Sequence, residues 1–410
     1  MANDEKKQLH ILVVTQYFYP ETFRINDMCR EWVNRGYKVT VLTGIPNYPM
    51  GKFFEGYGYR KKRNEIYEGV EIRRIPLIPR GSSAVGMAAN YLSFTLSGLK
   101  NKYTKDIDAD LVFTFEVSPM TQALIGVKYA KRHKVSSFLY VQDLWPENVI
   151  TVTGIRNGLV IGMINKMVDK IYRDTDVLFA TSPAFVKAIT DRKKPVAEKK
   201  VHYWPQYAED FYRPLERAAV PEIPDDGSFK IIFTGNIGTA QGLSILPRTA
   251  RLLKDINVRF VMVGDGRFLE ELNRQVETLQ VKDKFTMIPR RPAEDIPRLM
   301  AACDAAFISF NDDELWAKTI PAKLQSYMAC GLPVIASATG ETNRIIEEAE
   351  CGVTCKIGDA EALAAGIRSL TTMDTRALGN NSRTYFERHF DKKILMDEMD
   401  KWLQTAGSDT

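Results

Sequence analysis

The stretch KIIFTGNIGTAQG, residues 230–242, contains the pattern on which our prediction of the fold depends. Its first five residues are typical of a buried parallel strand, and three glycines follow within eight residues, at Gly235, Gly238 and Gly242. Glycine tolerates positive φ angles and lets a ligand approach the backbone closely. The free N–H groups at the start of a following helix attract phosphate. We therefore predict a phosphate-binding turn here, with a tight packing turn as the alternative.

Short β-branched segments alternate with amphipathic segments on both sides of this turn, almost from one end of the chain to the other. In the first half, we expect a strand at 10–16, a helix at 24–36 and a second strand at 38–43. In the second half, a helix is expected at 243–254 and a strand at 259–263. Such alternation predicts an α/β fold, with two doubly wound, Rossmann-like parallel-sheet domains that face a cleft.

The alternation breaks once, in a stretch with three prolines, many charges and no hydrophobic periodicity. We take this stretch, 207–228, as a linker between an N-terminal domain over 1–206 and a C-terminal domain over 229–384. The remaining residues, 385–410, are expected to form a C-terminal helix. Because ligands of doubly wound sheets bind at the carboxyl ends of the strands, candidate site residues are sought in the turns that follow strands.

Composition and charge exclude several classes of protein. Hydrophobic residues make up 45% and charged residues 26% of the 410, which excludes an intrinsically disordered chain. The net charge of +5 is too small for a dedicated nucleic-acid binder but allows contacts with phosphate or anionic lipid. Five scattered cysteines and four histidines predict a protein of the reducing cytoplasm without a structural metal. We also expect no membrane-spanning helix and no signal peptide, since no run of 18 apolar residues occurs and the first ten residues are charged.

Three charged side chains of the second half follow predicted strands. Arg290 and Arg291 follow the strand at 285–288 and suit contacts to a phosphate or a base. The alternative is that both arginines are simply solvated. Glu341 follows the strand at 333–337 and opens a helix, where it either binds a ligand or only stabilises the helix dipole.

The segment 312–331 is dense in polar groups before and along a predicted helix. Lys318 lies in the loop, and Pro321 opens the helix. Lys323 and Ser326 are three residues apart and therefore share one face of it. We interpret this segment as part of an anion site, with an ordinary surface helix as the alternative.

In the first half, acidic and basic side chains also follow predicted strands. Asp143 and Glu147 follow the strand at 137–142, where Asp143 suits an acid–base role or a turn cap. Glu21 and Arg24 follow the first strand. No glycine-rich fingerprint accompanies them, so a dinucleotide is not expected there. The chain also lacks a nucleophile triad, a P-loop lysine pattern and paired metal-ligand spacing.

These segments resemble a known family. The sequences FTGNIGTAQG, VGDGRFLEEL and TIPAKLQSYMACGLPVIASATGE resemble retaining glycosyltransferases of family 4 with the GT-B fold, over roughly residues 8–405. The sequences QYFYPE, GIPNYP, VQDLWPE and FATSPAF resemble the bacterial branch that builds O-antigen, capsule and colanic acid. The resemblance implies a nucleotide-sugar on the C-terminal domain and an acceptor on the N-terminal domain. It also implies that the tail helix packs back on the N-terminal domain.

The sequence departs from the family at four positions. The family often has two glutamates, seven residues apart, that hold the donor sugar and the ribose, and here these positions are Lys318 and Ser326. It also often has an arginine and a lysine in the first glycine turn that clamp the diphosphate. The corresponding residues here are the neutral Asn236 and Gln241.

Taken with the resemblance, the residues predict transfer, with retention, of a sugar from a UDP-sugar to an undecaprenyl-diphosphate-linked saccharide. The sugar is expected to be an N-acetylated amino sugar or a deoxy sugar. No cofactor is expected, because the UDP-sugar is a substrate. No metal is expected, since the sequence shows no acidic metal cluster, and no nucleic acid is expected at a net charge of +5. The alternatives are a non-catalytic GT-B partner protein and a UDP-sugar epimerase. The candidate residues are catalytic Asp143 and Lys323; donor-binding Gly235, Asn236, Gly238, Gln241, Arg290, Arg291, Lys318, Ser326 and Glu341; and acceptor-side Glu21, Arg24 and Glu147.

Attachment to the inner face of the cell membrane is a further expectation. Basic residues occur at 59–63, at 73–74 and at Arg80, and the apolar segments 86–99 and 158–167 carry few charges. Basic residues beside such a segment can hold a protein on anionic lipid. The alternative is that these segments are core helices beside solvated turns.

Overall fold

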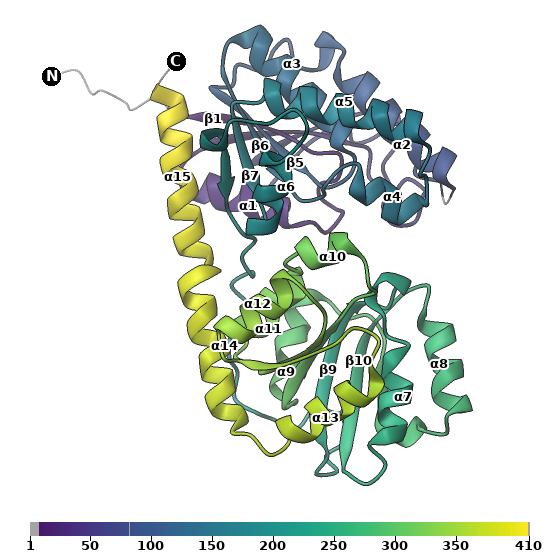
Figure 1. The fold of residues 1–410 in the computed structure, drawn as a ribbon. Coiled ribbons are helices and arrows are strands. Elements are labelled where there is room, and N and C mark those ends of the chain that lie inside the picture. The colour runs from purple at the N-terminus through teal and green to yellow at the C-terminus, as the bar shows by residue number, and fades with distance from the viewer. Residues whose placement is uncertain (1–7, 82, 409–410) are drawn as a thin grey trace, which may run out of the picture. The chain divides into compact units, whose positions relative to one another are not determined.

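The computed structural model describes residues 8–81 and 83–408, which divide into two units with one parallel sheet each (Figure 1). The first unit contains the chain as far as 181, together with 185–204 and the residues from 397 onward. The second unit contains 182–184 and 205–396. Both sheets bear out the expected α/β architecture.

The first sheet has the strand order β3-β4-β2-β1-β5-β6-β7-β8 and is parallel except for the β3–β4 pair. Its strands are β1 (His10–Val14), β2 (Lys38–Gly44), β3 (Asn64–Tyr67), β4 (Val70–Ile75), β5 (Leu111–Glu116), β6 (Ser136–Val141), β7 (Val177–Ala180) and β8 (Val201–Tyr203). All five residues of β1 are buried. Such continuous apolar strands belong to parallel sheets that are covered on both faces.

Helices cover this sheet, and they begin where the sequence pattern changes its period from two to about four residues. They are α1 (Arg24–Asn34), α2 (Ala84–Gly98), α3 (Ala123–His133), α4 (Glu147–Thr153), α5 (Gly158–Asp174) and α6 (Pro183–Thr190). Short 3₁₀ segments are η1 (Asn101–Tyr103), η2 (Met120–Gln122) and η3 (Glu198–Lys200). Within the ranges that the structure describes, none of the helices is long and apolar enough to cross a membrane.

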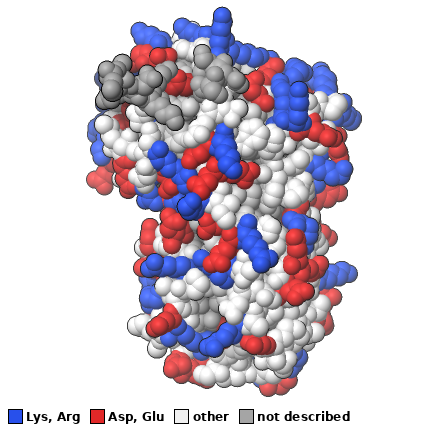
Figure 2. Space-filling view, turned by 90° about the vertical axis from the view of Figure 1, so that its left-hand side faces the viewer, with Lys and Arg blue, Asp and Glu red and all other residues white. Residues whose placement is uncertain are grey.

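The basic cluster expected in the first unit is only partly available at the surface. The Arg74 side chain is completely buried and forms an ion pair with Glu65, 2.8 Å apart. Arg73 pairs with Glu71 and with Asp106. The expectation that Arg74 contributes to a lipid-binding surface is therefore wrong, because a buried charge needs its partner and cannot leave it. On the face drawn in Figure 2, basic and acidic side chains are interspersed.

The second sheet has the order β11-β10-β9-β12-β13-β14 and is entirely parallel in its paired strands. Its strands are β9 (Phe229–Asn236), β10 (Val258–Asp265), β11 (Phe285–Ile288), β12 (Ala305–Ser309), β13 (Val334–Ser337) and β14 (Gly352–Cys355). Its helices are α7 (Ile245–Leu252), α8 (Leu269–Thr278), α9 (Ile296–Ala301), α10 (Glu314–Lys318), α11 (Ala322–Ala329), α12 (Glu341–Glu348), α13 (Ala360–Leu370) and α14 (Thr375–His389), with 3₁₀ segments η4 (Thr239–Gln241), η5 (Lys282–Lys284) and η6 (Ala293–Asp295).

Alternate residues of β9 serve the two hydrophobic cores of this unit. Ile231 and Phe233 belong to one core cluster, and Ile232 belongs to the other. Because successive side chains of a strand point to opposite faces, the two clusters lie on the two faces of the sheet. Both faces are thus covered, and only the ends of the strands remain open to a ligand.

The residues from 375 onward form two helices, α14 and α15 (Lys392–Ser408), rather than one helix. Phe390 is buried in the core of the second unit and has non-helical dihedral angles, with φ −131° and ψ 8°. The Asp391 carboxylate then accepts a hydrogen bond from the Ile394 N–H group at 3.1 Å, as an N-cap does. A buried aromatic residue followed by a capping residue therefore separates the two helices.

The final turns of α15 pack on the first unit. Nη1 of Arg35 lies 2.7 Å from carboxylate oxygens of both Asp397 and Asp400. The Trp402 ring contacts His202 and Phe179, with centroid distances of 4.2 and 5.8 Å. The last turns of α15 thus contact Arg35, Phe179 and His202.

We predict that Leu403→Ala lowers the free energy of unfolding by about 3 kcal/mol, since removal of a buried leucine side chain leaves a cavity. Leu403 is completely buried. Urea unfolding followed by circular dichroism measures the change. The matched control is Lys401→Ala on the exposed side of the same helix, which should change the value by less than about 0.5 kcal/mol. Equal stability of both variants would contradict the packing of α15 described here.

Candidate functional site

Each sheet has one topological switch point, where a central strand lies between two strands that the chain adds on opposite sides of it. In the second sheet, β9 lies between β10 and β12, and in the first sheet, β1 lies between β2 and β5. Ligands of doubly wound sheets bind outside the carboxyl ends of the strands at such switch points. The site residues are therefore described for each unit at these strand ends.

The glycine turn after β9 is built by a close approach of two backbones. Gly235 and Gly264 have φ angles of +117° and +150°, and a Cβ atom on Gly264 would lie 1.9 Å from the Gly235 carbonyl oxygen. Only glycine fits at Gly264. The interpretation of the sequence VGDG as a packing feature thus holds at Gly264. β9 also extends two residues beyond the predicted strand, to the exposed Asn236.

The rest of the turn is fixed by residues at the end of β12. The Ser309 hydroxyl donates to the Gln241 carbonyl oxygen at 2.5 Å, and the Asn311 amide group donates to the Thr239 carbonyl oxygen at 2.7 Å. The Asn311 N–H group donates to the carbonyl oxygen of Ala240 at 3.0 Å. Three successive carbonyl groups of the turn are thereby held against β12, so the loop between Gly238 and Gly242 has a defined shape before any ligand binds.

The Lys323 side chain extends from the first turn of α11 to this glycine turn. Its ammonium group contacts Oε1 of Gln241 and lies 4.1 Å from the centroid of the Phe233 ring. Among the described residues, no carboxylate forms an ion pair with it. Burial lowers the pKa of Lys323 to about 7. The structure therefore brings together two of the predicted residues, Lys323 and Gln241, and leaves the ammonium group without a countercharge.

The other predicted residues near α11 have different surroundings. The buried Ser326 hydroxyl donates to the Ala322 carbonyl oxygen one turn earlier, at 3.2 Å. Lys318 ends α10 and is partly exposed. Glu341 opens α12, is buried, and forms an ion pair with Arg344 at 2.8 Å. Part of the carboxylate of Glu341 is therefore engaged within its own helix.

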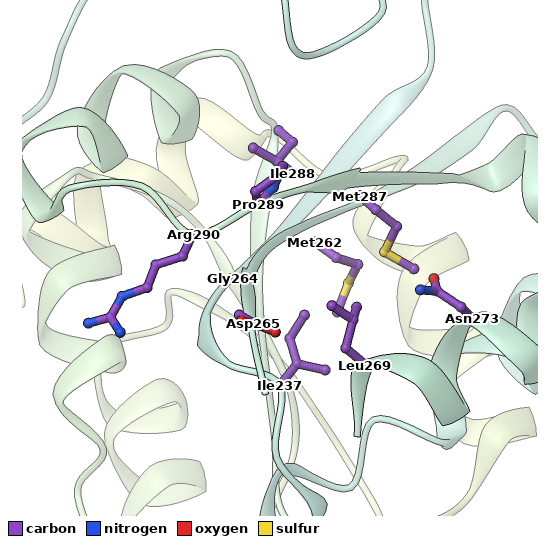
Figure 3. Close-up of a pocket in the computed structure, with 10 residues that line it drawn as sticks. All are labelled: Ile237, Met262, Gly264, Asp265, Leu269, Asn273, Met287, Ile288, Pro289 and Arg290. Carbon is purple, nitrogen blue, oxygen red and sulfur yellow. The ribbon is translucent and has the colours of Figure 1, made fainter. Parts of the chain in front are cut away.

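A cavity of about 300 Å³ lies at the carboxyl ends of β10 and β11 and beside α8 (Figure 3). Figure 3 shows Met262, Met287, Leu269 and Ile237 grouped together with Asn273 at one end, whereas Arg290 extends away from them. Its lining residues are Ile237, Met262, Gly264, Asp265, Leu269, Asn273, Met287, Ile288, Pro289 and Arg290. The cavity is thus mainly apolar with a few polar groups, as small-molecule sites are.

The two adjacent arginines differ in their environment. Arg290 is exposed and lines this cavity. Arg291 lies 3.7 Å from the Glu222 carboxylate, which also pairs with Arg298 at 2.8 Å. Hydrogen bonds from Arg298 lower the pKa of Glu222 to about 2. Arg291 is therefore engaged in a structural ion pair, whereas Arg290 is available at the cavity.

Sequence reasoning missed Asp265 and Asn273 as lining residues. Asp265 belongs to the VGDG turn, and the sequence favours a packing role for that turn. The structure shows that the turn packs closely and also lines the cavity. Asn273 lies within α8, eight residues further along the chain, and no motif marks it. Of these two residues, only Asp265 could have been found from the sequence, because it lies in a glycine-containing turn.

In the first unit, Asp143 is held by the neighbouring loop. Its Oδ2 accepts a hydrogen bond from the Ser118 N–H group at 2.7 Å, and its own N–H group donates to Oε2 of Glu116 at 3.3 Å. Burial raises the pKa of Asp143, and it raises the pKa of Glu116 well above its usual range. Glu116, which the sequence analysis does not single out, ends β5 as a fully buried acid.

The three predicted acceptor-side residues lie on different segments. Glu21 is almost fully buried, and its Oε1 accepts hydrogen bonds from the N–H groups of Asn47 and Tyr48 at 2.7 and 2.6 Å. Burial raises the pKa of Glu21 to about 7. Arg24 opens α1 and Glu147 opens α4. Glu21 thus fixes the loop after β2, and none of the described residues forms a hydrogen bond with Oε2 of Glu147, which is buried.

Acidic, cysteine and histidine side chains do not gather in the described parts of the chain in a way that could hold a metal ion.

Two family models match the sequence. The first, described as "Glycosyl transferase 4-like domain", matches residues 22–206, and the second, described as "Glycosyl transferases group 1", matches residues 217–385. The putative colanic acid biosynthesis glycosyl transferase WcaI of Escherichia coli (strain K12) is 24% identical over 413 residues, which cover 95% of this chain and 98% of WcaI. The probable glycosyltransferase WbjE of Pseudomonas aeruginosa is 24% identical over 293 residues, 70% of either chain.

Solved structures with a similar fold are glycosyltransferases as well. Sucrose-phosphate synthase from Thermosynechococcus elongatus has a TM-score of 0.76 at 15% identity, over 98% of this chain and 100% of that one. Anabaena Alr3699/HepE, solved in complex with UDP, has a TM-score of 0.69 at 15% identity, over 97% and 100%. Two family models that together span most of the sequence, and a shared fold of two parallel-sheet units, lead to one assignment: the chain belongs to the group 1, GT4-like glycosyltransferases of the GT-B fold.

Proposed function

We propose that this protein transfers a sugar from a UDP-sugar to a lipid-linked saccharide, with retention, during synthesis of a bacterial surface polysaccharide. The observation that carries the proposal is the ammonium group of Lys323, which contacts Gln241 and has no carboxylate partner among the described residues, beside a preformed glycine turn at the switch point of the second sheet. Two further facts support it. WcaI is named for colanic acid biosynthesis, and Alr3699/HepE was solved with UDP.

We assign the donor to the strand ends of the second unit. The cavity between Met262 and Met287 has the apolar surface that a nucleobase needs, and Asn273 and Asp265 supply polar groups for its edge. The diphosphate is assigned to the turn between Gly235 and Gly242, because glycine allows a ligand to approach the backbone closely. Arg290 and Lys318 remain candidates for the outer part of the donor.

Lys323 supplies the charge that stabilises the leaving group in this proposal. As the bond between sugar and phosphate breaks, negative charge grows on the departing UDP, and a preorganised cation stabilises it. Other members of the family often use a lysine at the position of Gln241. Here the ammonium group of Lys323 contacts the Gln241 side chain, so a lysine on α11 brings a cation to the same place.

We assign the acceptor to the strand ends of the first unit, with Asp143 as the acid–base candidate. A carboxyl group whose pKa is raised exchanges protons nearer to neutral pH than an ordinary aspartate does. The sugar transferred is proposed to be an N-acetylated amino sugar or a deoxy sugar. We propose no covalent enzyme intermediate, since no pair of carboxylates suited to one has been identified.

The experiment that tests the function is a donor and transfer screen. A ligand that binds only the folded state stabilises it, by about 2.7 kcal/mol at one hundred times its Kd. UDP and one or more UDP-sugars should therefore raise the unfolding temperature, and ADP should not. The stabilising UDP-sugar should then yield a product whose anomeric configuration matches the donor by NMR. Conversion of the UDP-sugar without acceptor would instead identify an epimerase, and binding without any turnover a non-catalytic partner.

Lys323→Ala should reduce turnover about a hundredfold, because loss of one contact made in the transition state costs about 3 kcal/mol. The substitution should not lower the unfolding temperature at neutral pH, since burial disfavours the charged lysine in the folded state. The matched control is Lys254→Ala at an exposed position of the same unit, which should keep full activity. Near-normal turnover of Lys323→Ala would remove Lys323 from the site.

Affinity for the UDP-sugar should fall above pH 7. The pKa of Lys323 is about 7 without ligand, and a bound diphosphate raises it by favouring the ammonium form. Below pH 7 the proton is already present in the free protein, so affinity is constant there. Above pH 7 binding must take up a proton, and affinity should fall about tenfold per pH unit until the pKa of the bound state is reached. Calorimetric titration from pH 6 to 9 measures this slope, which Lys323→Met should abolish.

Membrane attachment is proposed for the first unit. Exposed apolar side chains lie on α2 and α5: Val85, Leu92, Leu96, Leu159 and Met163, with exposed fractions between 53% and 82%. Their burial in a lipid interface would be favourable, and the basic residues at 59–63 could contact anionic headgroups. Flotation with anionic vesicles at low salt should therefore recover the protein. Leu92→Ser/Leu96→Ser should lower the recovered fraction, and unchanged recovery would contradict a role for α2.

A further inference from the structure

We infer that Arg80 in the first unit binds a phosphate group of the acceptor. The inference rests on the proposed function and gives its acceptor a defined anion site. Arg80 lies in the segment between β4 and α2.

The guanidinium group of Arg80 lacks strong hydrogen-bond acceptors. Nη1 lies 3.3 Å from the Tyr17 hydroxyl oxygen, and Nη2 lies 3.4 Å from the Met87 sulfur atom. A guanidinium group has five N–H donors, and a thioether sulfur is a weak acceptor. In the described part of the chain, no carboxylate forms an ion pair with Arg80, although its side chain is half-buried.

Other enclosed arginines of the same unit have the partners that Arg80 lacks. Arg74 is paired with Glu65 at 2.8 Å, and Arg192 is paired with Asp169 at 2.7 Å. A cation that is partly removed from water without a partner is costly. An anionic ligand therefore gains more binding free energy at an enclosed arginine with unused N–H donors than at an exposed arginine.

Aromatic rings hold the guanidinium group without using its N–H donors. The central carbon atom lies 5.3 Å from the Tyr48 ring centroid and 5.8 Å from that of Tyr91. The Tyr48 ring is itself packed against Tyr17, with a centroid distance of 5.3 Å. These cation–π contacts help to hold the guanidinium group, and its N–H donors then remain for hydrogen bonds to phosphate.

Buried amide side chains fix the backbone on which Arg80 stands. The Arg80 N–H group donates to Oδ1 of Asn47 at 2.8 Å, and the Asn90 amide donates to the Ile78 carbonyl oxygen at 2.6 Å. Asn90 in turn accepts from the Gln16 amide at 2.6 Å, at the end of β1. Arg80 is thereby linked to the switch point of the first sheet, and it is preorganised in a way that a surface arginine is not.

The surroundings of Arg80 favour a phosphate that is joined to an apolar chain. Ile78, Met50 and Val85 are 50%, 71% and 80% exposed. Gly51, next to Met50, packs so closely that a Cβ atom there would lie 2.4 Å from the Arg80 carbonyl oxygen. Exposed apolar residues therefore lie near Arg80 along the chain, and another precedes the glycine that packs against its backbone. A lipid diphosphate matches this combination of an anion and an apolar tail.

Binding of farnesyl diphosphate to the full chain, measured by calorimetry, tests the inference without a transfer assay. Arg80→Gln should weaken this binding by about 10- to 100-fold, the usual effect of losing hydrogen bonds to a charged group. The matched control is Arg156→Gln, which removes an exposed positive charge from the same unit and should leave binding unchanged. Arg80→Lys, which keeps the charge but loses the planar fork, should bind with intermediate affinity.

Equal affinity of Arg80→Gln and the natural protein would overturn the inference, as would farnesol binding as tightly as farnesyl diphosphate. Binding of inorganic pyrophosphate distinguishes a phosphate on a lipid acceptor from a phosphate on a soluble acceptor. Weaker binding of pyrophosphate supports a lipid acceptor, and equal binding supports a phosphate on a soluble one, with Arg80 as its ligand in either case. Should Arg80→Gln fail to fold, Arg80→Lys decides, and affinity equal to that of the natural protein would then count against the site. If UDP does not stabilise the natural protein, that result contradicts the proposed function. It does not contradict the inference about Arg80, because binding of farnesyl diphosphate is measured separately.

Discussion

The close approach of β9 and β10 at Gly235 and Gly264 is the constraint on which the donor side depends. A single methyl group on Gly264 would lie 1.9 Å from a carbonyl oxygen, so these two strands can be neighbours at their ends only while the position stays glycine. The same contact sets the direction in which the chain leaves β9. It thereby places the following turn against β12, where Ser309 and Asn311 bind its carbonyl groups. The packing of this turn is therefore compatible with the proposed binding of a ligand there.

In the first unit, amide side chains hold the segment that follows the strand at the switch point. No glycine turn follows β1, and Gln16 instead donates to Asn90 while its N–H group donates to Oε1 of Gln122. These hydrogen bonds join the segment after β1 to α2 and to η2, and buried hydrogen bonds of this kind fix the segments that they join. The segments at the two switch points are thus held by different means, glycine packing in the second unit and amide hydrogen bonds in the first.

The sequence predicts both sheets and the glycine turn because they depend on local patterns: runs of apolar residues, a change of period and glycines at strand ends. Lys323 could also be found, since it follows a proline at the start of a helix. The cavity could not, because Met262, Asn273 and Met287 come from three elements whose alignment is set by strand order. The structural role of Glu21 could not be predicted either. Its position after a strand suggests a site residue, and only the structure shows that its carboxylate accepts hydrogen bonds from the N–H groups of Asn47 and Tyr48.

The position of the positive charge in the donor site has a consequence for how the charge behaves. A lysine in a flexible surface loop stays hydrated and keeps an ordinary pKa, so its charge is constant near neutral pH. Lys323 instead extends from a helix past the Phe233 ring, and burial there brings its pKa to about 7. In the proposed function the ligand completes this charge, because an arriving diphosphate favours the ammonium form. On that proposal, a cation on the helix in place of one in the loop keeps the charge available for the leaving group and avoids a permanent, costly charge in the empty site.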